Sequence, residues 1–294
     1  MSVATPQKVK ELRERTQAGF MDCQKALIEN NGDIDKSIEW LREKGIAKAA
    51  KKADAIAAEG VTKILVSGDS CLILEVNTQT DFVAKNKEFQ DLVNLISESI
   101  LKNKKTSKED VEAMIVANGK DVKTLCLEAT GKIGEKINFR RAEILSKNKD
   151  QTFGVYQHSN DRVSSIILID GIVDTNVAKD VAMHVTAMNP KFINKNEIDK
   201  NWLETERKIL IEKTIQEGKP KEFAEKIVVG RLDKTIAEVC LEEQAFIKDP
   251  NIKVGTYLST NGGKISKMIR YELGEGIEKA NTDFVSEVTS QMKR

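Results

Sequence analysis

The stretch VTKILV at residues 61–66, followed by SGDS at 67–70 and CLILEV at 71–76, decides the fold of this chain. Both apolar stretches are rich in residues that favour strands, and the four residues between them are typical of a turn. The pattern therefore predicts a β-hairpin. Downstream, the spacing of apolar residues predicts helices and then a further strand. The helices are expected at about 85–101, 108–117 and 121–130, and the strand begins near Lys136.

The same order of elements recurs later in the chain. FGVYQHS at 153–159, a turn at Asn160-Asp161 and RVSSIILID at 162–170 predict a second hairpin, and KMIRYEL at 267–273 predicts a later strand. Helices separate this hairpin from that strand. Two hairpin-plus-strand units interrupted by helices indicate an α+β protein with two related small antiparallel sheets, and therefore an internal duplication.

Residues 1–45 predict a compact module of three short helices. Their apolar residues recur at helical spacing, and Asn30–Gly32 separates the second helix from the third. Asp33 is expected to cap the third helix, which is expected to end at Gly45. The core of so short a module is small, so we expect the module to lean on something else.

Residues 46–60 are rich in alanine and lysine. They predict a helical linker that is closed by Gly60. Its lysines suit a solvated helix face better than a contact with phosphate.

Residues 195–240 form a highly charged segment with two helical stretches. Between them, Gly218 suits a left-handed residue after the first helix, and Pro220 suits the first turn of the second. The pattern predicts an antiparallel coiled-coil hairpin that projects from the body, either as a contact device or as an insertion. Its apolar stripe is expected from Phe223, Ile227, Val228 and Leu232 on one helix and from Trp202, Ile209 or Leu210, and Ile215 on the other.

Composition and charge argue against several classes of protein. Lys and Arg number 47 and Asp and Glu number 46 among 294 residues, and the resulting net charge of +1 speaks against nucleic acid as a direct partner. No apolar run approaches the ~18 residues that span a bilayer, and the N-terminus lacks the apolar region of a signal peptide. We therefore expect a soluble, cytoplasmic protein with no membrane contact.

The sequence carries no pattern typical of an active site or a metal centre. The cysteines are scattered, and Cys71 and Cys240 are expected to be small core residues. His158 and His184 are too far apart for a zinc-binding helix, and no phosphate-binding glycine loop or nucleophile motif occurs. We expect no catalytic residue, no metal and no cofactor. A binding or regulatory protein is the leading class.

The segment Thr80-Asp81-Phe82-Val83 leaves a predicted strand and opens a predicted helix. Thr80 or Asp81 suits the N-cap of that helix. Phe82 then lies in the first turn, where it either staples the helix to its own sheet or is presented to a partner. The same four residues recur at 282–285. This repeat suits a duplicated architecture as well as two presented apolar tips, and both interpretations stay open.

Several long, ordered blocks of the chain carry a family resemblance. They are VKELRERTQAGFMDCQKAL at 9–27, NGDIDKSIEWLREKG at 31–45, EVNTQTDFVAKN at 75–86 and the later YQH, AMH, GKPKE and GEGIEK. Over nearly its whole length the chain resembles the elongation factor Ts family. The resemblance implies a ubiquitin-associated-like module at 1–45, a linker at 46–60, α+β core subdomains at 61–148 and 149–273, an arm at 195–240 within the second subdomain, and a C-terminal helical module at 274–294.

The resemblance also implies a function, a partner and a site. Members of the family are non-enzymatic nucleotide-exchange factors for the translational GTPase elongation factor Tu, which they bind in its GDP-bound and nucleotide-free forms. The family carries this activity on T-D-F-V, here Thr80, Asp81, Phe82 and Val83. The Phe tip is expected to enter an apolar pocket of the GTPase and to dislodge its magnesium ion, so that GDP is released.

A second contact with the GTPase is implied for the N-terminal module. By position, its candidate residues are Arg13, Phe20 and Met21. Members of the family often carry Met where this chain has Phe20. From the residues alone, the Phe20-Met21 pair suits core packing as well as contact with a partner.

Two other functions are weighed against exchange. One is an adaptor that uses the N-terminal module and the arm to scaffold other proteins. The other is an RNA-binding translation protein that uses the lysines of 48–52, which the neutral net charge and the few aromatic residues among them disfavour. Release of labelled GDP from elongation factor Tu discriminates between the exchange factor and the adaptor.

Overall fold

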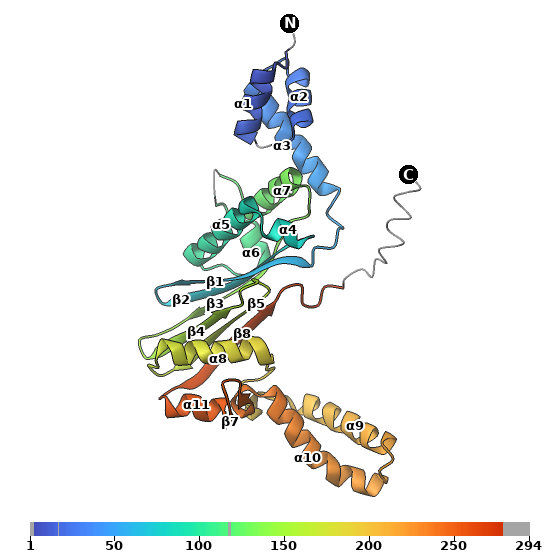
Figure 1. Ribbon diagram of the computed structural model, residues 1–294, viewed down its shortest axis with the longest axis vertical. Helices are drawn as coiled ribbons and strands as arrows, with labels where there is room; N and C mark the ends of the chain where they lie inside the picture. The colour runs from blue at the N-terminus through green and yellow to red at the C-terminus, as the bar shows by residue number, and fades with distance from the viewer. Residues whose placement is uncertain (1–2, 17, 117–118, 279–294) are drawn as a thin grey trace. The chain divides into compact units, whose positions relative to one another are not determined.

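The structure is a computed structural model that describes residues 3–16, 18–116 and 119–278 (Figure 1). These residues form an α+β fold, as predicted, and divide into two compact units. The first unit draws on residues 1–62, 74–143 and 272–294, and the second on residues 63–73 and 144–271. The second T-D-F-V at 282–285, and all but the first residues of the expected C-terminal module at 274–294, lie outside the described residues.

The first unit begins with three helices, α1 (Pro6–Thr16), α2 (Phe20–Glu29) and α3 (Ile34–Ala50). Their common core consists of small and aliphatic side chains, which are Ala4, Val9, Leu12, Cys23, Ala26 and Leu27. The predicted cap of the third helix is confirmed, because the Asp33 carboxylate accepts a hydrogen bond of 3.0 Å from the Lys36 N–H. That this module is ubiquitin-associated-like stays a prediction.

The predicted end of the third helix at Gly45 is wrong, because α3 continues to Ala50. Gly45 lies against Gly131 of α7 (Val122–Ile133), and a Cβ added to Gly131 would lie 2.4 Å from the Gly45 carbonyl oxygen. The two glycines therefore allow two helices to approach closely. An ion pair of 2.5 Å between Arg42 and Glu128 joins the same helices. The expected linker at 46–60 is helical only in its first part, since turns follow at 51–54.

Three further helices of the first unit are α4 (Asp81–Ala84), α5 (Lys87–Asn103) and α6 (Lys108–Glu112). The helices expected near 85–101 and 121–130 are confirmed in α5 and α7, whereas α6 ends earlier than the expected 117. One face of α5 is buried at helical spacing through Phe89, Leu92, Val93, Ile96 and Ile100. No helix in the described ranges has an apolar stretch long enough to cross a membrane.

Both predicted hairpin-plus-strand arrangements occur. One sheet has the order β1 (Glu59–Ser67), β2 (Ser70–Thr78), β3 (Asn138–Ser146), and the other has the order β4 (Gln151–Gln157), β5 (Val163–Asp170), β8 (Lys264–Glu272). The second hairpin is antiparallel, with its register running from Gln151 opposite Asp170 to Gln157 opposite Ser164. The short strands β6 (Ala245–Phe246) and β7 (Asp249–Lys253) were not predicted, whereas the helix α11 (Val254–Thr260) lies in the interval where helices were expected without stated bounds.

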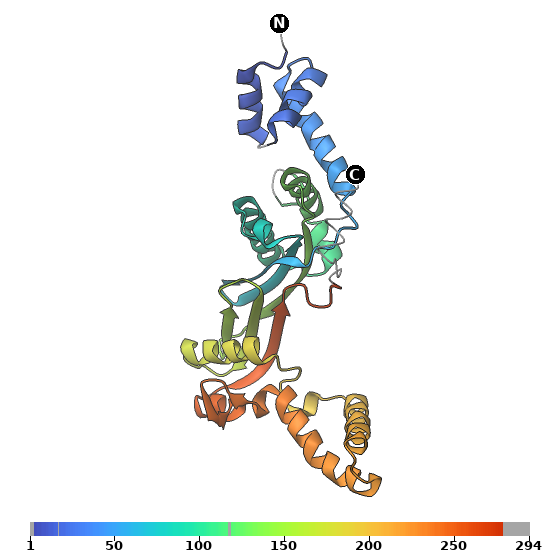
Figure 2. The ribbon, with the colours of Figure 1, turned by 45° about the vertical axis from the view of Figure 1, so that its right-hand side comes forward.

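In the second unit, strand β5 is buried on both of its faces. Ile166 and Leu168 pack in one apolar cluster, whereas Ile167 and Ile169 pack in another with α8 (Thr175–Met188). Side chains alternate between the two faces of a strand, so a continuous apolar run supplies both clusters. In Figures 1 and 2, α8 lies along the sheet that contains β5.

The charged segment forms an antiparallel pair of helices, α9 (Lys200–Gln216) and α10 (Lys221–Val239), which lie side by side (Figure 2). The 3₁₀ turns Lys195–Glu197 and Leu241–Glu243 flank this pair. Gly218 has the predicted left-handed backbone, with φ of 84°. Pro220 is the residue before α10 and not part of its first turn.

The predicted stripe between these two helices is wrong in part. Val228 is buried as expected, together with Ala224 and Thr214, but Phe223 is 57% exposed and Ile209 also faces solvent. Apolar residues occupy more than one side of each helix, so their spacing does not identify the side that meets the partner helix. Ile215 is exposed as well.

Candidate functional site: the loop between strand β2 and helix α4

The T-D-F-V segment forms the step from β2 into the short helix α4. Thr80 has an extended backbone with φ of −127° and ψ of 155°, and its hydroxyl accepts a hydrogen bond of 3.4 Å from the Val83 N–H. This is the geometry of an N-cap. Of the two caps that the sequence left open, Thr80 is the one observed, and Asp81 is the first residue of α4.

Phe82 is an isolated apolar side chain on this step. It is 80% exposed, whereas the next residue, Val83, is only 8% exposed. Ala84 is also buried, so the apolar anchoring of α4 comes from the two residues after Phe82. Phe82 is therefore presented to solvent, and its interpretation as a staple is wrong.

Asp81 lies beside Phe82 and is half exposed. Its carboxylate forms an ion pair of 3.1 Å with Lys85 one turn later in the chain. Exposed pairs of this kind contribute little to stability, so the pair opens readily when a competing partner approaches. The step therefore offers one apolar and one acidic side chain together.

The loop is fastened to a residue far away in the sequence. The Glu135 carboxylate accepts hydrogen bonds of 2.9 Å from the Thr80 N–H and 2.9 Å from the Thr80 hydroxyl, and one of 3.3 Å from the Thr78 hydroxyl. The neighbouring residue adds a further bond of 2.9 Å, from the Lys136 N–H to the side-chain oxygen of Gln79. No local sequence pattern predicts Glu135 as a site residue, because 55 residues separate it from Thr80.

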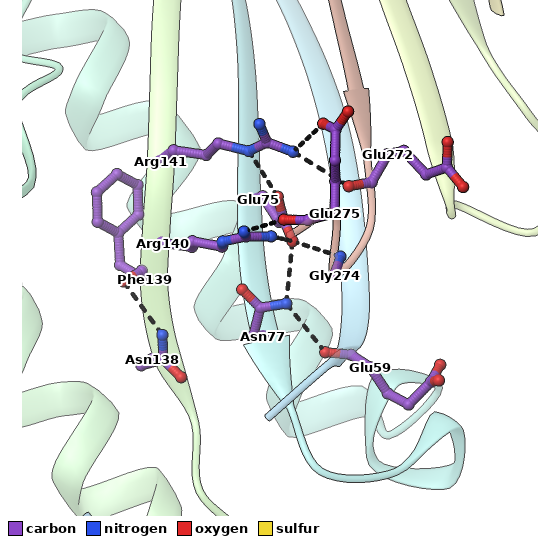
Figure 3. Close-up of polar contacts among 10 residues, drawn as sticks. All are labelled: Glu59, Glu75, Asn77, Asn138, Phe139, Arg140, Arg141, Glu272, Gly274 and Glu275. Atoms are coloured by element: carbon purple, nitrogen blue, oxygen red, sulfur yellow. Dashed lines mark hydrogen bonds and ion pairs between the residues drawn. The ribbon is translucent and has the colours of Figure 1, made fainter. Parts of the chain in front are cut away.

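A buried carboxylate supports the strand that leads to the loop. Glu75 of β2 is fully buried, and it accepts hydrogen bonds from the Gly274 N–H at 2.8 Å, Arg140 at 2.7 Å, Arg141 at 2.7 Å and Asn77 at 3.0 Å (Figure 3). We call these five residues the Glu75 cluster. The sequence did hold a signal for it, because Glu75 is the one charged residue in the apolar run CLILEV.

The protonation of Glu75 reflects two opposing effects. Burial raises the pKa of this carboxyl, and the hydrogen bonds from Gly274, Arg140, Asn77 and Arg141 lower it. The combined effect of the hydrogen bonds exceeds that of burial, so the pKa of Glu75 is lower than that of an ordinary glutamate. Glu75 is thus a buried anion that ties β2 to β3 and to the turn that follows β8.

The N-terminal candidates lie on other elements. Phe20 and Met21 open α2 and are 51% and 72% exposed, and Arg13 is exposed on α1. The core of the three helices does not include Phe20 or Met21, so core packing is not their role. The structure thus gives two separate exposed groups, one on α1 and α2 and one at the start of α4.

In the described part of the chain, the remaining titratable residues form no candidate metal centre. No group of three His, Cys, Asp or Glu side chains there is placed to hold a metal ion. All four cysteines are buried and free, as was expected for Cys71 and Cys240. Burial raises the pKa of the Cys71 thiol to about 12.

Comparison with known proteins places this loop in a family. Residues 79–275 match the family model described as "Elongation factor TS". The chain is also 58% identical over 288 residues to elongation factor Ts of Malacoplasma penetrans (strain HF-2), and the alignment covers 98% of each protein.

The chain belongs to the elongation factor Ts family. The family match begins at Gln79 and therefore includes Thr80–Val83 and Glu135. The N-terminal helices precede that match but lie within the 98% of the chain that aligns with the Malacoplasma protein. Both exposed groups thus belong to an elongation factor Ts sequence.

Proposed function

We propose that this protein is the guanine-nucleotide exchange factor for elongation factor Tu, and that it works without bond-making chemistry. The observation that carries the proposal is the exposure of Phe82 on a loop that is held in place. Glu135 binds Thr80 before Phe82, and the Thr80 hydroxyl caps the helix through the Val83 N–H after it. A large apolar side chain held in solvent by a rigid support is typical of a residue that is buried by a partner. Membership of the elongation factor Ts family identifies the partner.

The proposed mechanism removes the magnesium ion from the GDP-bound GTPase. Mg²⁺ bridges phosphate oxygens of the nucleotide and protein ligands, so its displacement weakens GDP binding. In the proposal Phe82 enters an apolar pocket near the ion, and Asp81 supplies a charged acceptor beside it. Thr80 and Val83 hold the loop, one by its cap and one by its burial.

The energetics require differential affinity and no chemical step. The factor must bind nucleotide-free elongation factor Tu more tightly than the GDP-bound form, because a ligand shifts an equilibrium only by its difference in affinity for the two states. The same coupling lets GDP weaken the binding of the factor. The protein thereby catalyses exchange in either direction during translation elongation.

The proposal includes a second contact and a location. Arg13, Phe20 and Met21 are exposed side chains that would add affinity for the GTPase without acting on the nucleotide. The protein would work in the cytoplasm and would contact elongation factor Tu, with no direct contact to nucleic acid or membrane.

The test is the release of labelled GDP from purified elongation factor Tu, measured with and without this protein. The full chain should accelerate release. Phe82→Ala should reduce the acceleration about ten- to a hundredfold, because burying a Phe side chain contributes roughly 1.5–3 kcal/mol. The unfolding midpoint should stay the same, since Phe82 is exposed in the free protein.

Two control variants make the result specific. Phe223→Ala truncates another exposed phenylalanine, on α10, and should leave release unchanged. Phe284→Ala truncates the second T-D-F-V and should have the smaller effect of the two copies. Suppose that Phe82→Ala accelerates GDP release as much as the unaltered chain does, while Phe284→Ala abolishes the acceleration. The function has then been assigned to the wrong copy of T-D-F-V.

A further inference from the structure

Glu135 lies just after helix α7 and reaches the start of α4. Gly134 ends α7 with a left-handed backbone, φ of 90°, and turns the chain toward the loop. Both oxygens of the Glu135 carboxylate then receive hydrogen bonds from Thr80, at 2.9 Å from its N–H and at 2.9 and 3.0 Å from its hydroxyl. Bonds to an ionised acceptor are stronger than bonds between neutral groups.

These bonds decide how the cap of α4 works. A threonine hydroxyl has one hydrogen to donate and two lone pairs to accept with. Because the hydrogen of the Thr80 hydroxyl points to Glu135, its lone pairs are left for the Val83 N–H, which donates to it at 3.4 Å. Glu135 therefore orients the cap, and the cap in turn fixes the first turn of the helix that contains Phe82.

Helix α4 needs this support more than a longer helix would. It spans only Asp81–Ala84, and a single helical turn is unfavourable on its own because nucleation fixes several residues for few hydrogen bonds. The side-chain contact of Gln79 with the Lys136 N–H, at 2.9 Å, holds the preceding residue of the loop in the same way. The direction of Phe82 thus depends on residues 135 and 136.

We propose that Glu135 is a positioning residue for nucleotide exchange, which acts by holding Phe82 in the direction that enters the partner. This inference rests on the proposed function, because it assigns Glu135 an effect only through Phe82. A side chain that must displace a bound ion gains from being fixed beforehand, since ordering it on binding would cost free energy. Glu135 itself is half-buried and acts in the proposal without touching the partner.

The test is a double-mutant cycle on GDP release from elongation factor Tu. Glu135→Gln keeps the shape of the side chain but removes its charge, and it should slow release about tenfold, which is the size expected for losing hydrogen bonds to a charged group. The loss should not exceed that of Phe82→Ala. In the Phe82→Ala background, Glu135→Gln should have no further effect, because its route of action has been removed.

A pair of threonine variants provides a second route if Glu135→Gln folds poorly. Thr80→Val removes the hydroxyl at nearly constant shape, and it should slow GDP release as much as Glu135→Gln does. Thr80→Ser keeps the hydroxyl, and it should release GDP faster than Thr80→Val, at a rate close to that of the unaltered chain. The double variant with Thr80→Val and Glu135→Gln should accelerate GDP release no less than either single variant does. Urea unfolding of each variant checks that the slower release does not reflect unfolded protein.

The outcomes separate the two proposals. If Phe82→Ala does not slow release, the proposed function fails. If Phe82→Ala slows release but Glu135→Gln and Thr80→Val do not, only the positioning role fails. If Glu135→Gln slows release further in the Phe82→Ala background, Glu135 touches the partner directly, and the positioning role is overturned.

Discussion

Two adjacent residues, Phe82 and Val83, differ sharply in exposure to solvent. Phe82 is 80% exposed and makes no contribution to an apolar core, whereas Val83 is 8% exposed and anchors α4. Thr80 and Glu135 then set the direction of the exposed side chain. A change of one position along a helical turn thus separates the residue that we propose for partner binding from one that the fold needs.

Glu75 gives a prediction at the residue scale. Glu75→Gln should lower the free energy of unfolding by about 3 kcal/mol at neutral pH, because it removes a buried charge and its ion pairs with Arg140 and Arg141. Because folding lowers the pKa of Glu75, its contribution is present above the ordinary glutamate pKa of about 4.3 and is lost as the pH falls through the folded value. Urea unfolding at several pH values measures both effects.

The control for this prediction is an exposed glutamate on α5. Glu98→Gln should change the free energy of unfolding by no more than about 0.5 kcal/mol at any of these pH values. The stability gap between the unaltered chain and Glu75→Gln should narrow in acid. A gap that stays constant from neutral pH down to strongly acid pH would show that the charge of Glu75 does not stabilise the fold.

At the scale of elements, the sequence predicts what is local and misses what is distant. The β-hairpins follow from short apolar runs around turn residues, and the cap at Asp33 follows from one side chain near its own helix. The end of α3 was misplaced at Gly45 because that glycine meets Gly131, which lies far away in the sequence. The role of Glu135 was missed for the same reason.

Helix α10 supplies a prediction at this scale. Gly230 lies inside the helix, and a Cβ added to it would have no atom within 4 Å. Gly230→Ala should therefore raise the free energy of unfolding by about 1 kcal/mol, because alanine loses less backbone freedom on folding. Gly218→Ala is the matched change at a left-handed position, with φ of 84°, and should lower it by about 1 kcal/mol.

Thermal or urea unfolding of the full chain measures both changes. The opposite signs matter more than the sizes, since both variants add the same methyl group to the same pair of helices. If Gly230→Ala destabilised the protein, the outer face of α10 would have to be in contact with something that leaves no room for a methyl group.

At the scale of the whole molecule, the proposal is that two exposed groups contact one partner. Phe20 and Met21 lie on α2, and Phe82 lies on α4. Because these are separate elements, the losses in binding free energy from changing each group should add. Phe20→Ala with Met21→Ala should weaken binding to nucleotide-free elongation factor Tu about tenfold, by the apolar area that they no longer bury.

Calorimetry on the single and combined variants checks this additivity. The Phe20 and Met21 changes should reduce affinity, whereas Phe82→Ala should in addition slow GDP release when the GTPase is saturated with the factor. If the variant with Phe20→Ala and Met21→Ala binds elongation factor Tu as tightly as the unaltered chain does, these two residues of the N-terminal module are not in the interface.

The burial of every native thiol has a practical consequence for spectroscopy. Cys23, Cys71, Cys126 and Cys240 are all buried, and burial raises the pKa of the Cys71 and Cys126 thiols to about 12. Only a thiolate reacts readily with maleimides, so the native cysteines of the unaltered chain should react little during site-specific labelling. Lys85→Cys would place one accessible thiol a single turn from Phe82, at the cost of an exposed ion pair of small value. A fluorophore there would report the docking of the loop in real time, without removal of any native cysteine.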